Sequence, residues 1–267
     1  NTTILLSLTV LIALPAWAAD LSEDVKSAAK KLAEKPNYSW TTKSESAQPA
    51  GGQGAQGAQS RGRGGFGGGT SSGKIDKDGF ALLSFTMGDT TSDAVLKGDK
   101  VAVKSGDEWK TGEELAADSG DGNTFNRGRF LAQRVQRTKL PATDAQELAG
   151  KVKELKKDGD AYTGDLTADA VKQMNTFGGG RRPGGNAGGN APAGPDTSGL
   201  KGTAKFWVND GVLSKYETHI TGKMTMPGRQ GGETREINVD RTTTVEIKDV
   251  GTTKVEVPAA AKKKLKS

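Results

Sequence analysis

The sequence predicts an α+β fold, a curved antiparallel β half-barrel covered by a few helices and carrying two disordered Gly-rich insertions. The stretch from Lys201 to Pro258 alternates apolar and polar residues between turn signals, which is typical of a β-meander. Helical patterns come in groups between runs of strands, which argues against a parallel α/β sheet. A sheet with one apolar face must cover it with helices or curl over a cavity.

The first residues resemble a secretory signal. An apolar run from Ile4 to Leu14 precedes Ala16-Trp17-Ala18, a small-x-small cleavage site. The run is too short to span a membrane, and since the sequence starts without Met we expect the reading frame to begin upstream. The chain has no Cys, which excludes disulfides, thiolate catalysis and a lipid-anchoring lipobox. The mature protein is therefore expected to be periplasmic or extracellular.

Two Gly-rich tracts, Ala47–Gly73 and Gly178–Gly199, hold 11 and 9 of the 38 glycines. We expect disordered loops there, because such composition buries too little apolar surface to fold. The predicted organisation is a signal peptide at 1–18, a single half-barrel domain at 19–258 interrupted by loops at 47–73 and 178–199, and a basic tail at 259–267.

The net charge of +6 comes mainly from arginines of these tracts and lysines of the tail. The remainder is near neutral, so it carries no basic footprint of a nucleic-acid partner. Arg61–Phe66 looks like a short RGG box, the kind of segment that binds RNA. Behind a secretory signal, we favour a flexible insertion instead.

The N-terminal half is expected to begin with a helix over Asp20–Lys35, whose apolar residues follow a 3.6-residue period. Asp20 and Glu23 suit a capping box, and Pro36 marks the stop. The strands expected next are Asn37–Ser46, a hairpin in Gly73–Gly88 that turns at Lys77-Asp78-Gly79, a second hairpin in Thr91–Lys104, and Glu108–Thr111. The strand from Phe80 to Met87 is apolar on both faces, which indicates a central position.

Helices are expected to follow. Thr143–Lys157 has the clearest pattern, with Thr143 as the cap and Asp158-Gly159 as the stop. The other expected elements are a helical turn at Glu113–Ala117, a basic helix at Phe125–Thr138, an extended piece at Ala161–Leu166 and a helix from Thr167 to Asn175. The meander adds strands at Thr203–Asp210, from beyond Gly211 to Met226, Glu236–Asp249 and Lys254–Val257.

Catalytic patterns are missing from the sequence. The one histidine, His219, falls on the polar face of a strand, so neither a transition-metal site nor a Ser-His-Asp arrangement is indicated. Neither Gly-rich tract has the context of a phosphate loop. The loop Ser119–Asn123 resembles a calcium-loop fragment, but its spacing is wrong. We predict a non-enzymatic protein with no cofactor and no metal.

Several strands together resemble a known family. The segments are VLKGDKVAV (Val95–Val103) with Glu108-Trp109-Lys110, GTAKFWVNDG (Gly202–Gly211), TTTVEIKDVG (Thr242–Gly251) and VEVP (Val255–Pro258). With the signal peptide and the interrupting helices, the order resembles the lipoprotein-carrier (LolA/LppX-like) superfamily over residues 20–258 outside the tracts. The resemblance implies a half-barrel closed by helices over a hydrophobic cavity that binds acyl chains of a lipid or lipoprotein.

The inward rows of the predicted strands are the candidate ligand-binding residues. They are Phe80, Leu82, Val101, Val103, Phe206, Tyr216, Ile220, Val245 and Ile247. Packed core is the alternative for each of them. The leading hypothesis is a protein that binds an apolar ligand and transports or senses it. The alternative is a cell-envelope interaction module whose basic tail and Arg-Gly tracts touch anionic membrane surfaces or polymers.

Overall fold

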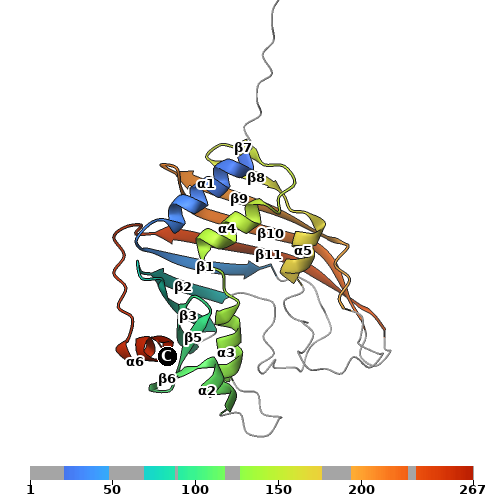
Figure 1. The fold of residues 1–267 in the computed structure, drawn as a ribbon. Coiled ribbons are helices and arrows are strands. Elements are labelled where there is room, and N and C mark those ends of the chain that lie inside the picture. The colour runs from blue at the N-terminus through green and yellow to red at the C-terminus, as the bar shows by residue number, and fades with distance from the viewer. Residues whose placement is uncertain are drawn as a thin grey trace, which may run out of the picture.

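The computed structural model describes residues 21–47, 69–87, 90–117, 127–175, 194–227 and 233–266. They form one open antiparallel sheet with helices packed on it (Figure 1), which confirms the predicted fold class. The strands are β1 (Tyr38–Ser46), β2 (Gly69–Ile75), β3 (Phe80–Met87), β4 (Thr90–Lys97), β5 (Lys100–Ser105), β6 (Glu108–Thr111), β7 (Lys156–Asp158), β8 (Ala161–Asp165), β9 (Leu200–Asn209), β10 (Val212–Met226) and β11 (Arg235–Lys248). The helices are α1 (Leu21–Ala33), α2 (Gly112–Ala117), α3 (Arg127–Gln136), α4 (Pro141–Ala149), α5 (Ala168–Asn175) and α6 (Ala259–Lys266).

The sheet consists of two meanders joined at one seam. Its order is β6-β5-β4-β3-β2-β1-β11-β10-β9-β8-β7, so the N-terminal and C-terminal meanders meet only where β1 pairs with β11. The register of that pair runs from Ser39 opposite Lys248 to Ser46 opposite Arg241. Between β10 and β9, the predicted turn has the expected backbone, with positive φ at both Asp210 and Gly211.

The helix-covered face, called the inner face below, carries the main core. Helix α1 buries Val25, Ala28, Ala29 and Leu32. In Figure 1, α1, α4 and α5 lie across β9, β10 and β11. These helices and the inner rows of the strands form one continuous cluster of buried residues. The amphipathic pattern in the sequence therefore correctly indicated which side of α1 faces the sheet.

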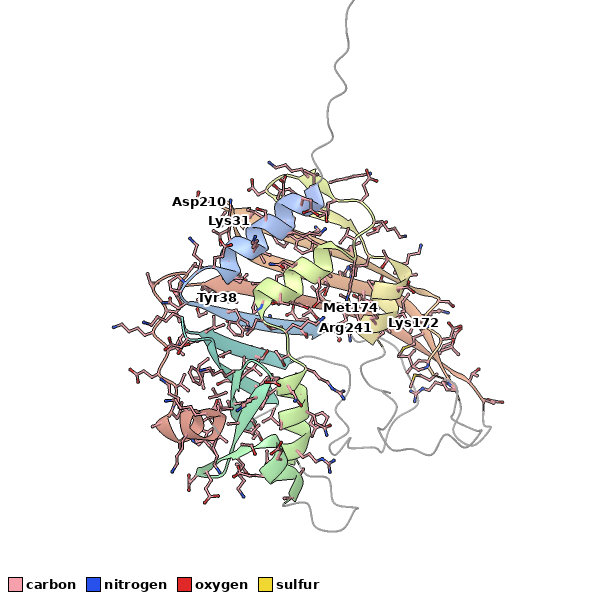
Figure 2. All side chains as sticks on the ribbon, in the orientation of Figure 1. Lys31, Tyr38, Lys172, Met174, Asp210 and Arg241 are labelled. Atoms are coloured by element: carbon pink, nitrogen blue, oxygen red, sulfur yellow. The ribbon has the colours of Figure 1, made fainter. Side chains whose placement is uncertain are left out.

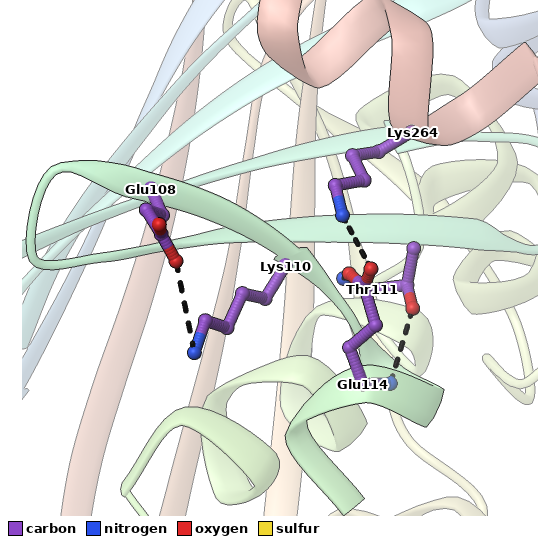
Figure 3. A network of polar contacts seen from close by, with 5 residues as sticks. All are labelled: Glu108, Lys110, Thr111, Glu114 and Lys264. Atoms are coloured by element: carbon purple, nitrogen blue, oxygen red, sulfur yellow. Dashed lines mark hydrogen bonds and ion pairs between the residues drawn. The ribbon is translucent and has the colours of Figure 1, made fainter. Parts of the chain in front are cut away.

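A smaller core lies on the opposite, outer face under helix α6. Ala261 and Leu265 of α6 are buried against Phe80, Val95 and Trp109. Lys264 donates a hydrogen bond to Glu114 (Figure 3). The segment predicted as a basic tail is thus a packed helix. Strand β3 is covered on both faces, as its apolar pattern indicated.

Glu114 also belongs to a capping box at the start of α2, visible in Figure 3. The backbone N–H of Thr111 donates to Oε2 of Glu114 at 2.8 Å, and the backbone N–H of Glu114 donates to Oγ1 of Thr111 at 3.2 Å. One carboxylate therefore both caps α2 and holds α6. A similar cap starts α5, because Thr167 accepts from the backbone N–H of Ala170, as predicted.

Two predicted elements are wrong. Helix α4 starts at Pro141, whose fixed φ suits the first helical position, and Thr143 is not its cap. It ends before Gly150, because the chain beyond pairs with strand residues, and Val152 bridges to Leu166.

Residues 253–258 form no strand. After Gly251, which has positive φ, the chain crosses to the outer face, where Val257 joins the smaller core.

Other sequence expectations fall partly or wholly outside the described residues. The signal peptide at 1–18, the RGG-like segment and the calcium-like loop all lie outside them. The tract boundaries are shorter than predicted where the structure describes them. Gly69–Gly73 belongs to β2, and Asp196 forms a β-bridge with Thr225.

The packing of Trp40 on Gly73 gives a test of the pairing of β1 with β2. A β-carbon built on Gly73 would lie 2.1 Å from Cζ2 of Trp40, whereas one on Gly69 meets nothing closer than 3.9 Å. We expect Gly73→Ala to lower the unfolding free energy by about 1–3 kcal/mol, because the ring must leave its position. Gly69→Ala, on the same strand, should change it by less than about 0.5 kcal/mol. Urea unfolding of both variants checks this, and equal effects would contradict the close packing.

Candidate functional site

The structure divides the nine predicted ligand-binding residues between the two faces. Seven lie on the inner face with exposed fractions between 0 and 8 %: Val101, Val103, Phe206, Tyr216, Ile220, Val245 and Ile247. Phe80 and Leu82 belong to the smaller core on the outer face. The expectation that all nine share one face is therefore wrong for these two, because the inner row of β3 is Ala81, Leu83 and Phe85.

The seven inner residues are packed against helices and against one another. The rings of Phe206 and Tyr216 stack with centroids 6.5 Å apart. Helices α1 and α4 cover the central strands, while α3 packs on β4 and β5 beside Val101 and Val103. This part of the inner face is closed core. A ligand would have to enter elsewhere or displace a helix.

A buried polar cluster holds α4 on the sheet. The hydroxyl of Tyr216 donates to Oδ2 of Asp144 at 2.8 Å, which links β10 to α4. Burial raises the pKa of the Asp144 carboxyl, and the hydrogen bond from Tyr216 partly opposes this effect. Burial likewise raises the pKa of Tyr38, which lies on β1 under α4 (Figure 2), to about 12. No sequence pattern indicates this cluster, because Asp144 and Tyr216 are 72 positions apart.

The raised pKa predicts that Asp144 weakens folding as pH rises. Below the ordinary value of 3.8 the carboxyl is protonated in both states. Between that value and the raised folded pKa only the unfolded chain releases the proton, so stability falls with increasing pH. We expect Asp144→Asn, which keeps an acceptor for Tyr216, to gain stability relative to wild type across this window and then level off.

Unfolding free energies of wild type and Asp144→Asn at a series of pH values measure the effect. Asp158→Asn removes an exposed acid outside the helices and serves as the control. Its curve should run parallel to that of wild type. A parallel curve for Asp144→Asn as well would contradict the burial argument.

The inner face is less covered beside α5. Four apolar side chains there are only partly buried: Met174 of α5, Met226 of β10, and Ile237 and Val239 of β11. We call these four residues the apolar strip. On the sheet, Ile237 lies opposite the buried Met224, and Val239 lies opposite Gly222, which has no side chain. The strip is thus an apolar surface continuous with the core and partly open to solvent.

Arg241 follows the strip on the same row of β11. It lies opposite Ile220 on β10 and Ser46 on β1. Figure 2 shows Arg241 beneath the end of α5, next to Met174. Its Nη2 donates to the carbonyl oxygen of Met174 and to Oδ1 of Asn175, each at 3.3 Å. Burial lowers the pKa of the Arg241 guanidinium.

The strip and Arg241 together present apolar side chains beside one guanidinium. Within the described ranges, no group of three or more His, Cys, Asp or Glu side chains could hold a metal ion. His219 lies on the outer face, where it pairs with Asp240 at 2.9 Å. The period-2 pattern of the sequence puts Arg241 in the apolar row of β11, but periodicity alone says nothing of its partners.

No protein-family model matches the chain, and neither does any curated protein. Among solved structures, the chain is similar to the lipoprotein LppX of Mycobacterium tuberculosis, with 12 % identity, a TM-score of 0.43, and 89 % of this chain and 98 % of that chain covered.

Two further solved structures are similar. LprF from Mycobacterium bovis shows 10 % identity and a TM-score of 0.38, covering 90 % of this chain and 96 % of that one. A LolA superfamily protein from Nitrosomonas europaea shows 9 % identity and a TM-score of 0.30, with the same coverage of 90 % and 96 %. These likenesses concern the fold, and they carry no information on the ligand of this chain.

The helices of the described residues are short. None of them is long and apolar enough to cross a membrane.

Proposed function

We propose that this chain is a non-enzymatic periplasmic or extracellular protein that binds an apolar ligand, the acyl chain of a lipid or lipoprotein, on the inner face of its half-barrel. The observation that carries the proposal is the apolar strip. Met174, Met226, Ile237 and Val239 remain partly open beside α5, whereas most apolar residues of the central strands under α1 and α4 are buried. Flexible Met side chains adapt to ligands of varied shape.

The strip also leads into the predicted ligand-binding rows. Ile220 lies opposite Arg241, and Val245 follows on the same row of β11. The end of the strip nearest the core thus lies beside Ile220, and entry of a ligand beyond this point would require α4 or α5 to move. Burying a chain of this kind contributes about 25 cal/mol per Å² of apolar surface.

A direct test is the binding of N-phenyl-1-naphthylamine, a neutral fluorescent probe, to delipidated protein. We expect saturable binding to wild type. Val239→Asp should weaken it by roughly tenfold or more, because a carboxylate in the strip must lose its water when an apolar ligand binds. Asn238→Asp is the matched control, since Asn238 is exposed on the opposite face of the same strand.

Two outcomes would contradict the proposal. One is the absence of saturable probe binding to wild type, and the other is an equal loss in both variants. Native mass spectrometry of protein purified gently from its own envelope fraction adds an independent measurement. A discrete added mass that extracts as lipid would support the proposal and give the class of the ligand.

The alternative of an envelope interaction module has one observation in its favour. Helix α6 presents lysines on the outer face, with Lys263 and Lys266 exposed. Such a basic helix can adsorb to anionic lipid. This function predicts salt-sensitive binding to vesicles of anionic phospholipid that is lost in Lys263→Gln/Lys266→Gln. Probe binding on the inner face should be unchanged in that variant.

A further inference from the structure

Arg241 is a half-buried cation that lacks an acidic partner. Both acceptors of its Nη2, the carbonyl of Met174 and Oδ1 of Asn175, are neutral. Among the residues that the structure describes, no carboxylate forms an ion pair with it, and burial alone accounts for its shifted pKa. A guanidinium has five N–H donors, so most of its capacity for hydrogen bonds is unused within this part of the chain.

The acids of β11 all point away from Arg241. Glu236, Asp240 and Glu246 lie on the outer face, where they pair with Lys223, His219 and Lys248. The inner row of the same strand has no acid; its members are Arg235, Ile237, Val239, Arg241, Thr243, Val245 and Ile247. The other cation of the row, Arg235, is exposed at the start of the strand, so Arg241 is the one half-buried charge of this row.

The neighbouring sequence offers no acid either. The segment after α5, residues 176–193, and the segment between β10 and β11, residues 228–232, contain Arg181, Arg182 and Arg229 but no Asp or Glu. The carbonyls at the C-terminal end of α5 compensate part of the charge through the helix dipole. They leave the guanidinium without the carboxylate that a half-buried arginine usually has.

We propose that the ligand of the apolar strip carries an acidic headgroup, a carboxylate or phosphate, that pairs with Arg241. This inference rests on the proposed function and adds the chemical class of the ligand. Met174 connects the two parts, because its carbonyl accepts from Arg241 while its side chain belongs to the strip. The planar fork of arginine matches the two oxygens of a carboxylate or phosphate. The acyl chain lies along the strip and the headgroup meets Arg241 at its end.

The test compares ligands that share one acyl chain and differ in charge. Oleic acid, oleyl phosphate, oleyl alcohol and methyl oleate displace N-phenyl-1-naphthylamine from wild-type protein at pH 8. We expect the two acids to bind roughly 10 to 100-fold more tightly than the two neutral ligands, the range that a charge-assisted hydrogen-bonded pair gives. Arg241→Gln should abolish this preference, and Arg241→Lys should keep part of it.

A control separates the charge of Arg241 from its structural contact with α5. Asn175→Ala removes one acceptor of Arg241 and keeps the positive charge. It should therefore retain the preference for acids, even if probe binding weakens overall. Loss of the preference in Asn175→Ala and Arg241→Gln alike would overturn the proposal in favour of a purely structural role.

The outcomes for wild type separate this inference from the proposed function. Probe binding with equal affinity for acids and neutral ligands overturns the acidic headgroup and leaves the function standing. No probe binding at all overturns the function itself. Sodium acetate and inorganic phosphate, at matched ionic strength, distinguish a headgroup from a free anion. If either abolishes the preference for oleic acid, Arg241 is a site for small anions and the headgroup proposal fails.

Discussion

The structure depends on the pairing of β1 with β11. Among the described strands, this ladder alone connects the two meanders within the sheet, and it joins residues about two hundred positions apart. Each meander forms locally, since its strands are neighbours in the chain, but neither has the full inner face alone. The side chains of Ser44 and Thr243 add a hydrogen bond of 3.0 Å across the seam. Once the seam forms, one continuous apolar face exists for the helices to cover.

The helices cover that face unevenly, and this unevenness creates the candidate site. Helices α1 and α4 pack on each other and over the central strands, where exposure falls to a few per cent. Helix α5 spans only Ala168–Asn175 and leaves the ends of β10 and β11 partly open. Because α5 is short and the β10–β11 hairpin is long, part of the inner face of the hairpin stays uncovered. The apolar residues there adjoin the core but remain partly exposed. Such surfaces are typical of binding sites.

Charged side chains are also distributed unevenly between the two faces of the sheet. Acids and bases of β10 and β11 alternate on the outer face, where solvent and ion pairs accommodate them. On the inner face, Asp144 and Arg241 are charged groups whose ionised forms are disfavoured by burial, and they differ in their surroundings. Asp144 has Tyr216 as its donor and serves to hold α4. Among the described residues, Arg241 donates to two neutral acceptors at the end of α5.

The sequence by itself determined the fold class, most strand positions and the turn at Asp210-Gly211, because these follow from local periodicity and backbone preference. It also identified the inner rows of β9, β10 and β11. It could not determine which face of β3 is inner, since Phe80, Leu82, Leu83 and Phe85 are apolar on both sides. The register of β3 with β2 and the packing of α6 on the outer face decide which side of β3 is inner.

Only the tertiary structure decided the extent of α4, the packing of the basic C-terminal segment and the surroundings of Arg241. Each depends on partners distant in the chain: Leu166 for the segment after α4, Phe80 and Trp109 for α6, and the end of α5 for Arg241. A pattern of hydrophobic residues records which side of an element is buried. It does not indicate which other element buries that side, or how completely. The candidate site depends on how completely the inner face is buried.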